Sequence, residues 1–327
     1  MNDMPVRSLA AVTAVLAASS VLMLAPSARA QFPERAIRLS VSFPAGGTGD
    51  AVGRVLADAL SVRLKTTVVV DNQGGAGGTI GAAAVARAAP DGYTMLLSAT
   101  AVFAIIPHMR KVDFDPIKDL KPIARVGESL RAIAVNPNVP ATTLAEFIAY
   151  AKKNPGKLNY GSAGAGSTVH ILTEAFQRAA GIEMVHVPYR GAAPALQGLL
   201  EGSIDVLIDT VVIPQIKSGS VRGLATVGDE RLAELPELAT LAEAGFPGVR
   251  TSGWTGLFGP ARLPPPLVAL YAKNVEEAFA DRAFADRLVL TGSKPAFLGP
   301  EAFAKYVADD NAYFGRLIAE AGIKLQN

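Results

Sequence analysis

The sequence predicts an α/β fold of two lobes, each a mostly parallel sheet flanked by helices, with a ligand cleft between the lobes. From Ile37 onward, short apolar runs alternate with helical patterns, which is typical of strand–helix units around a largely parallel sheet. The chain has 327 residues, and the 297 that follow the first 30 exceed one typical hydrophobic core. Two glycine-rich segments, one in each expected lobe, stand between an expected strand and an expected helix.

The first thirty residues are expected to be an export signal that is cleaved from the mature protein. Arg7 precedes an apolar stretch at residues 9–24, which is shorter than the roughly 20 apolar residues that a bilayer span needs. Pro26 ends this stretch before the small-x-small sequence Ala-Arg-Ala at 28–30, so we expect cleavage after Ala30 and release into the periplasm. An uncleaved anchor would be longer and would lack the cleavage site.

The composition excludes several classes of protein. The chain has no cysteine, so a lipoprotein anchor, a disulfide scaffold, a thiol nucleophile and cysteine metal sites are all excluded. The 31 basic and 29 acidic residues give a net charge of +2, too small to recruit nucleic acid or a membrane surface. His108, His170 and His186 lack the H-x-x-x-H or H-E-x-x-H spacing of a metal site, and we expect neither a metal nor a cofactor.

The first lobe is expected to begin with the clearest strand–helix unit of the chain. Apolar and polar residues alternate from 37 to 43, which predicts a strand, and residues 44–50 form a glycine-rich turn. Apolar residues at helical spacing then predict a helix over 52–64. The same lobe, expected over 31–135, contains further predicted strands at 67–70, 93–97 and 131–135 and a predicted helix at 80–88.

A second lobe is expected over residues 136–259. Residues 136–140, Asn-Pro-Asn-Val-Pro, form a connector, and a capping box at 143–146 opens a new helix. Strands are predicted in this lobe at 158–161, 185–187 and 206–208, and a helix at 168–180 that Gly181 closes. The helices predicted at 266–280, 283–290 and 300–321 are expected to pack back on the first lobe as its final part, 260–327, so that the chain crosses between the lobes twice.

Two loops are the best candidates for a binding site, namely Pro44–Asp50 and Gly161–Ser167. Each precedes a helix, whose first turn offers unpaired N–H groups and the positive end of the helix dipole to an anion. Hydroxyl groups of Thr48, Ser162 and Ser167 would add donors. One such loop is weak evidence, since Asp50 or Ser167 would serve equally well as a simple helix cap. Two loops, one in each lobe, indicate a cleft.

The common nucleotide and hydrolase signatures are absent. The glycines between 74 and 81 never satisfy G-x-G-x-x-G, and no glycine loop is followed by the sequence GK[ST]. A nucleophile elbow around Ser162 would need glycine where Tyr160 stands.

Several side chains near these loops have two interpretations each. His170 either faces the cleft or makes a structural hydrogen bond within its helix. Tyr189 and Arg190 are suited to stacking on and pairing with an acidic ligand, although a surface arginine beside a turn is the alternative. Asp209 is unfavourable beside an anion unless it receives an amine, bridges through water or caps a helix. Trp254 is expected in the core or between the lobes rather than in a ligand wall.

Five segments of the chain together resemble the Bug-type receptors of tripartite tricarboxylate transporters, and the resemblance covers the whole mature chain. The segments are Phe43-Pro44-Ala45-Gly46-Gly47-x-x-Asp50, Val70-Asp71-Asn72 with Gly75-Ala76-Gly77-Gly78, Ala89-Pro90-Asp91-Gly92-Tyr93-Thr94, Tyr160-Gly161-Ser162-x-Gly164-x-Gly166-Ser167 with His170, and Val187-Pro188-Tyr189-Arg190-Gly191.

The resemblance implies a type II periplasmic-binding-protein fold that closes over a carboxylate held mainly by the two strand-to-helix loops, often with ordered water. The ligand-binding residues it implies are Ala45, Gly46, Gly47, Thr48, Asp50, Ser98, Thr100, Ser162, Ala163, Gly164, Ser167, His170, Tyr189, Arg190 and Asp209. The chain departs from the pattern at Gly49, where relatives often carry a hydroxyl residue; here Thr48 stands one position earlier.

The leading hypothesis is a monomeric periplasmic binding protein without enzymatic activity. It would capture a small organic acid, an acidic amino acid or an aromatic acid and hand it to a membrane transporter of the tripartite tricarboxylate type. A second hypothesis keeps the binding fold but presents the ligand to a sensor kinase. A third, an exported hydrolase, depends on Ser162 or Ser167 lying near His170.

Overall fold

The computed structural model describes residues 32–228, 230–249 and 253–321. Arg35–Asn327 forms one compact unit, and all the elements below belong to it. The predicted export signal and its cleavage site lie outside the described residues. Within the described part, no helix has the length and apolar character needed to cross a bilayer.

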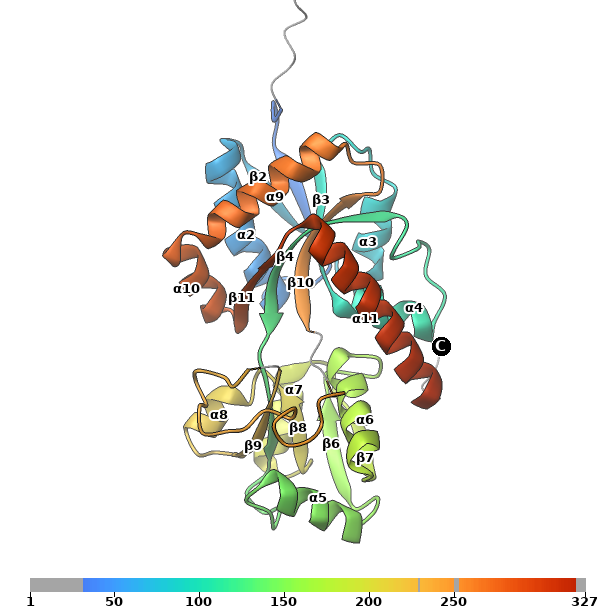
Figure 1. The fold of residues 1–327 in the computed structure, drawn as a ribbon, viewed down its shortest axis with the longest axis vertical. Coiled ribbons are helices and arrows are strands. Elements are labelled where there is room, and N and C mark those ends of the chain that lie inside the picture. Colours follow the sequence, from blue (N-terminus) through green and yellow to red (C-terminus); the bar gives the residue numbers. More distant parts are fainter. Residues whose placement is uncertain (1–31, 229, 250–252, 322–327) are drawn as a thin grey trace, which may run out of the picture. The chain divides into compact units, whose positions relative to one another are not determined.

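The first sheet has six strands in the order β11-β4-β10-β3-β1-β2 (Figure 1). Its strands are β1 (Ile37–Val41), β2 (Val68–Asn72), β3 (Thr94–Ala99), β4 (Leu120–Ser129), β10 (Trp254–Pro260) and β11 (Ser293–Leu298). Its helical segments are α2 (Thr48–Leu64), η2 (Ala76–Gly78), α3 (Thr79–Ala86), η3 (Ala101–Ile105), α4 (Ile106–Met109), α9 (Pro265–Phe279), α10 (Arg282–Leu290) and α11 (Pro300–Ala321).

The second sheet has five strands in the order β7-β6-β8-β5-β9. Its strands are β5 (Arg131–Val135), β6 (Leu158–Ser162), β7 (Met184–Pro188), β8 (Val206–Asp209) and β9 (Arg222–Val227). Its helices are α5 (Leu144–Lys153), α6 (Thr168–Ala180), α7 (Ala192–Glu201) and α8 (Ile213–Lys217). Two sheets flanked by helices confirm the predicted fold class.

Both sheets are mixed, since each combines parallel with antiparallel strands. β1 is parallel to β2 and β3, but β10 is antiparallel to β3 and β4, and β11 is antiparallel to β4. In the second sheet β6 is parallel to β7 and β8, whereas β5 is antiparallel to β8 and β9. The antiparallel pairs arise mainly at β4, β5 and β10, the strands that carry the chain from one sheet to the other and back.

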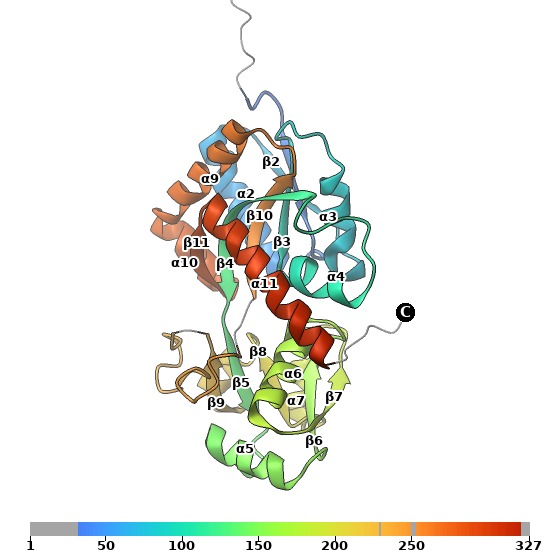
Figure 2. The same cartoon turned by 45° about the vertical axis from the view of Figure 1, so that its right-hand side comes forward.

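The crossings do not fall at the expected boundaries. Only Leu130 separates β4 from β5, so the strand at 131–135 belongs to the second sheet and not to the first. The strand at 254–260 belongs to the first sheet, although it was expected in the second lobe. In each case a strand that lies beside a crossing pairs with the sheet it enters, and no local sequence pattern marks that choice. Figure 2 shows β4 running into β5.

The strand directions place both candidate loops at the same junction. β4 ends at the crossing, and β3 runs parallel to it because both are antiparallel to β10, so β1, β2 and β3 also end at this edge. β5 begins at the crossing, and β8 is antiparallel to it, so β8 ends there. β6 is parallel to β8, and β7 is parallel to β6, so these two strands end there too. β9 also runs against β5 and ends there, so the carboxyl ends of eight strands, four from each sheet, meet the crossing.

Helix ends confirm several of the signals in the sequence. Thr143 caps α5 by accepting a hydrogen bond of 3.2 Å from the amide of Glu146, as the capping box predicts. Ser167 caps α6 through the amide of His170, and Gly181 closes it with a φ of 63°. Helix α6 matches the predicted range, 168–180, at both ends.

Trp254 lies in the core of the first lobe, as expected. It is fully buried, and its ring packs against Phe103, Phe258 and Phe303 at centroid distances of 5.7, 5.9 and 5.1 Å. Its Nε1 donates a hydrogen bond of 2.7 Å to the carboxylate of Asp310. The residue therefore stabilises the start of β10 and does not line a cleft.

The C-terminal helix contacts both lobes. It packs on β4 and η3 of the first lobe, as expected for the returning segment. Phe314 also shares an apolar cluster with Ile171 of α6 and Ile105 of η3, and Arg178 donates a hydrogen bond of 2.8 Å to the carbonyl of Glu320. In Figure 2, α11 extends from the first sheet toward α6.

Candidate functional site

The first candidate loop, residues 44–47, joins β1 to α2 and is held by a carboxylate in the helix. Asp50 accepts hydrogen bonds from the amide of Gly46 at 2.8 Å, from Nδ2 of Asn72 at 3.0 Å and from Nε of Arg54 at 3.1 Å. The N-cap of α2 is Gly47, which makes no side-chain cap, so Asp50 is not the N-cap that its position suggested. It folds the loop back onto the first turn of the helix.

Asp50 remains a carboxylate in this setting. Burial acts to raise its pKa, but the hydrogen bonds from Gly46, Arg54 and Asn72 outweigh burial and hold the pKa below its usual range. The Gly46 amide is therefore occupied, whereas the amides of Thr48 and Gly49 open the helix and have no acceptor within it. Ala45, Gly46, Gly47 and Thr48 are exposed.

Gly49 lacks a side chain because the ring of Phe43 occupies its place. A Cβ built on Gly49 would lie 2.2 Å from Cδ2 of Phe43. In this chain the aromatic ring fills the space that a side chain at position 49 would need.

We expect Gly49→Ser to lower the free energy of unfolding by about 1–3 kcal/mol, because Phe43 must leave its position. Chemical denaturation measures this change. Gly47→Ser is the matched control, since a Cβ there has only the Pro44 carbonyl oxygen nearby, at 3.7 Å. Equal losses in the two variants would contradict the steric account, and Phe43→Ala should relieve most of the cost of Gly49→Ser.

The second candidate loop, residues 162–167, is held by two histidines. The Ser162 hydroxyl group lies 2.7 Å from Nε2 of His186 and bridges the amide and carbonyl of Gly164 at 3.1 and 3.0 Å. Nδ1 of His170 accepts a hydrogen bond of 3.1 Å from the amide of Gly166. His170 thus makes a structural hydrogen bond between the first turn of its helix and the preceding loop, one of its two expected roles.

The two histidines stack on each other and on Tyr160. Their ring centroids are 4.0 Å apart with an interplanar angle of 9°, and the Tyr160 ring lies 4.9 Å from His186. Burial lowers the pKa of His170 to about 4. Burial, with repulsion from His170, also lowers the pKa of His186 to about 4. Both imidazoles are therefore neutral at neutral pH. Sequence reasoning missed His186, because its approach to His170 depends on how β7 lies against α6.

The remaining predicted residues of the first lobe lie at the end of β3. Ser98 is fully buried, and its hydroxyl group has no hydrogen-bond partner within the described structure. Thr100 accepts a hydrogen bond of 3.0 Å from the amide of Trp254, next to the second crossing. Thr100 directly precedes η3, whose Ile105 packs with Ile171 of α6, so the end of β3 and the start of α6 lie in one region.

Tyr189 packs on its own lobe. A Cβ on Gly198 of α7 would lie 2.3 Å from the Tyr189 hydroxyl oxygen, so the ring covers this helix. Arg190 is exposed beside it. The ring therefore braces α7, and the exposed guanidinium is the member of this pair that is accessible to a ligand.

Asp209 ends β8 in a buried position and accepts hydrogen bonds from the amides of Thr210 and Val211 at 2.6 and 3.3 Å. Burial raises its pKa, and Arg131 opposes that rise. Arg131 is also buried, at the first residue after the crossing, and its guanidinium stands 2.0 Å from where a Cβ on Gly253 would be. Sequence reasoning placed Arg131 in a strand and missed this charge at the junction of the lobes.

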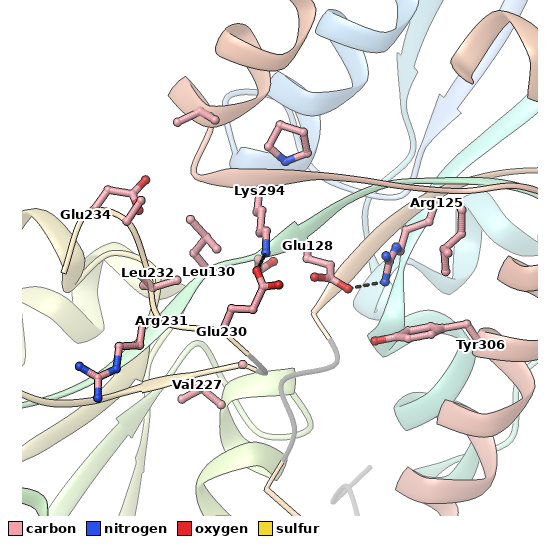
Figure 3. Close-up of a pocket in the computed structure, with 16 residues that line it drawn as sticks. Arg125, Glu128, Leu130, Val227, Glu230, Arg231, Leu232, Glu234, Lys294 and Tyr306 are labelled. Atoms are coloured by element: carbon pink, nitrogen blue, oxygen red, sulfur yellow. Dashed lines mark hydrogen bonds and ion pairs between the residues drawn. The ribbon is translucent and has the colours of Figure 1, made fainter. Parts of the chain in front are cut away.

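A separate pocket lies along β4, β9 and β11 (Figure 3). It measures about 640 Å³, and none of the predicted site residues lines it. Lys294 pairs with Glu230 at 2.8 Å, and the Arg125 guanidinium, paired with Glu128, lies 5.0 Å over the Tyr306 ring. The described residues contain no group of three or more His, Asp or Glu side chains arranged to hold a metal ion.

Comparisons with known proteins agree with this architecture. Residues 52–323 match the model of the tripartite tricarboxylate transporter family receptor. Protein BugT of Bordetella pertussis is 33% identical over 92% of this chain and 94% of its own. An R. palustris protein solved with adipate is 32% identical, with a TM-score of 0.79 over 90% of this chain and 99% of its own. MatC from Rhodopseudomonas palustris with bound malate is 30% identical, with a TM-score of 0.74 over 88% of this chain and 100% of its own.

Proposed function

We propose that this chain, which belongs to the tripartite tricarboxylate transporter receptor family, captures a small carboxylate between its two glycine-rich loops. Receptors of this family are periplasmic solute-binding proteins. The observation that carries the proposal is the position of two helix N-termini, those of α2 and α6, at the sheet edges where eight strands end. Such termini bind anions through backbone N–H groups and the helix dipole.

Several backbone amides of the two loops make no hydrogen bond within the described structure, and such N–H donors suit a carboxylate. In the first loop the Gly46 amide is occupied by Asp50, which leaves those of Thr48 and Gly49. In the second loop the described structure leaves the amides of Ala163 and Ala165 without a protein acceptor. We place the ligand carboxylate between these two sets, with Arg190 near enough to the second loop to receive another acidic group.

Small dicarboxylates are the first ligands to test. The R. palustris neighbour was solved with adipate and MatC with malate. Backbone amides recognise any carboxylate, so we propose that the choice among acids depends on side chains at the strand ends. Arg131 and Asp209, two buried residues at the crossing ends of β5 and β8, are the side chains we propose for that choice.

We assign no catalysis to the site. Ser162 is fully buried, and its hydroxyl group already bridges both backbone groups of Gly164. Its histidine partner is His186 and not His170, and the nearby carboxylate of Glu174 is bonded to Tyr160 and Gln177 instead of orienting the imidazole. A hydrolase needs an accessible hydroxyl group and an oriented base. These contacts support a structural role for the serine.

A ligand screen tests the proposal. We expect a cognate acid to stabilise the purified protein by about 2.7 kcal/mol at a hundredfold excess over its dissociation constant. Thermal unfolding with malate, adipate, tricarboxylates, acidic amino acids and aromatic acids measures this, and calorimetry gives the stoichiometry. A flat response across all these acids would contradict the proposal, and turnover of an ester that is lost in Ser162→Ala would favour the hydrolase.

Delivery to a tripartite tricarboxylate-type transporter is the second part of the proposal, and family membership supports it. Deletion of the gene should abolish uptake of the identified acid while the transporter genes are still expressed. Unchanged uptake together with a lost transcriptional response to the acid would assign the protein to ligand sensing instead.

A further inference from the structure

We propose that His170 and His186 are positioning residues, which as neutral rings hold residues 162–167 in the shape that binds the carboxylate; this rests on the proposed function of that loop. Neither ring need touch the ligand. Each binds a different point of the loop, and the stacking between them connects those two points.

The first point is Ser162. A serine hydroxyl group has one proton, and here it lies 3.0 Å from the carbonyl oxygen of Gly164. The oxygen accepts from the Gly164 amide at 3.1 Å, and its remaining neighbour is Nε2 of His186 at 2.7 Å. We therefore assign the Nε2–H tautomer to His186, which makes it a donor to the serine and keeps the hydroxyl proton directed at Gly164.

The second point is Gly166. Its amide donates to Nδ1 of His170, which requires an unprotonated Nδ1 and hence the Nε2–H tautomer of a neutral ring. Gly164 and Gly166 have φ values of 124° and 76°, in a region where side chains are strained, so these glycines set the path of the loop. His170 accepts from the amide of Gly166, and His186 contacts the Ser162 hydroxyl group that accepts from the amide of Gly164. The amides of Ala163 and Ala165 keep free donors in the described structure.

Tyr160 and Glu174 support the stacked rings of His170 and His186. Tyr160 lies beside His186 in the β6–β7 register, and its hydroxyl group bonds the carboxylate of Glu174, which also accepts from Gln177 at 3.0 Å. Tyr160 and Glu174 are the titratable groups of the described structure that face the two rings. Burial favours the neutral form of both imidazoles, and a charge on either ring would repel a charge on the other at 4.0 Å.

Nuclear magnetic resonance of the ligand-free protein tests the contacts directly. With ¹⁵N-labelled protein at neutral pH, we expect both rings as Nε2–H tautomers and slow hydrogen exchange at the amides of Gly164 and Gly166. A proton on Nδ1 of His170, or fast exchange at Gly166, would overturn the proposal. This measurement needs no variant and no ligand.

Binding by matched variants tests the consequence. His170→Phe and His186→Phe keep a flat ring in the stack but remove the nitrogen, and His108→Phe makes the same change at an exposed histidine of the first lobe. With adipate and malate as probes, we expect at least about tenfold weaker binding in the first two variants and none of that loss in the third. The Gly166 amide should exchange faster in His170→Phe.

The outcomes separate the two proposals. If the wild type binds neither probe while both rings and both amides behave as expected, the carboxylate function fails and the holding role stands. If the wild type binds but the first two variants bind as tightly as His108→Phe, the positioning role is wrong. If a variant does not fold, the tautomers and amide exchange of the wild type decide.

Discussion

Trp254→Ala should lower the free energy of unfolding by about 3–5 kcal/mol, the usual range for truncating a buried tryptophan. The ring contacts three phenylalanines of the first lobe, and its loss leaves a large cavity beside β10. The change also removes the Nε1 donor from Asp310, a buried carboxylate. Guanidinium unfolding followed by circular dichroism measures the loss, because the chain has a single tryptophan and the variant has none to report by fluorescence.

Trp254→Phe separates packing from hydrogen bonding. It keeps an aromatic ring against Phe103 but removes the donor to Asp310, so we expect a smaller loss of about 1–3 kcal/mol. The Trp254 amide also donates to the hydroxyl group of Thr100, a predicted site residue, beside the second crossing. A loss below about 1 kcal/mol in Trp254→Ala would contradict the placement of this residue in the core.

The local signals in the sequence were sufficient for the loops and for most helices. Thr143, Ser167 and Gly181 end their helices as their residue types predict, because caps depend only on neighbouring backbone groups. The two glycine-rich loops stand between strand and helix as predicted, and strand directions bring both to the crossing. Ligand binding by the residues of these two loops stays a prediction.

Pairing between strands that are distant in the sequence could not be predicted from such local signals. β4, β9, β10 and β11 were missed or assigned to the wrong lobe, since antiparallel pairing between distant segments leaves no periodic mark that names the partner. The same reason hid the histidine pair. His186 meets His170 and Tyr160 only because β7 pairs with β6 in one register, and a shift of one residue would turn His186 to the other face.

Acid should destabilise the protein well above the range in which carboxylates act, because of the two stacked histidines. Burial lowers the pKa of His170 from 6.5 to about 4, and burial with repulsion from His170 does the same to His186 against the attraction of Glu174. Between about pH 6.5 and pH 4, the unfolded chain therefore binds protons on rings that stay neutral in the folded protein. The neutral histidines therefore make their full contribution to stability when the pH is above their pKa in the unfolded chain. That contribution is lost as the pH falls toward their pKa in the folded protein.

The expected loss is about 3 kcal/mol. A pKa lowered from 6.5 to about 4 in one imidazole corresponds to about 3 kcal/mol of stability. His186 adds less than this amount, because it is half-buried and solvent screens its charge. Carboxylates such as Asp50 and Glu243, whose pKa values are lowered from 3.8 and 4.5, lose their contribution only below those values. Their loss therefore falls below the interval between about pH 6.5 and pH 5, in which the two histidines take up protons in the unfolded chain.

Urea unfolding at about pH 7.5, pH 6 and pH 5 measures this slope. The double variant His170→Phe with His186→Phe should be nearly flat over that interval, because no buried imidazole is left to take up protons only in the unfolded chain. His108→Phe should keep the slope of the wild type, because it leaves both stacked rings in place. A wild type whose stability does not change between about pH 7.5 and pH 5 would mean that the rings take up protons in the folded protein. In that case Nδ1 of His170 could not hold the Gly166 amide in acid, and the loop should lose its carboxylate over the same pH range.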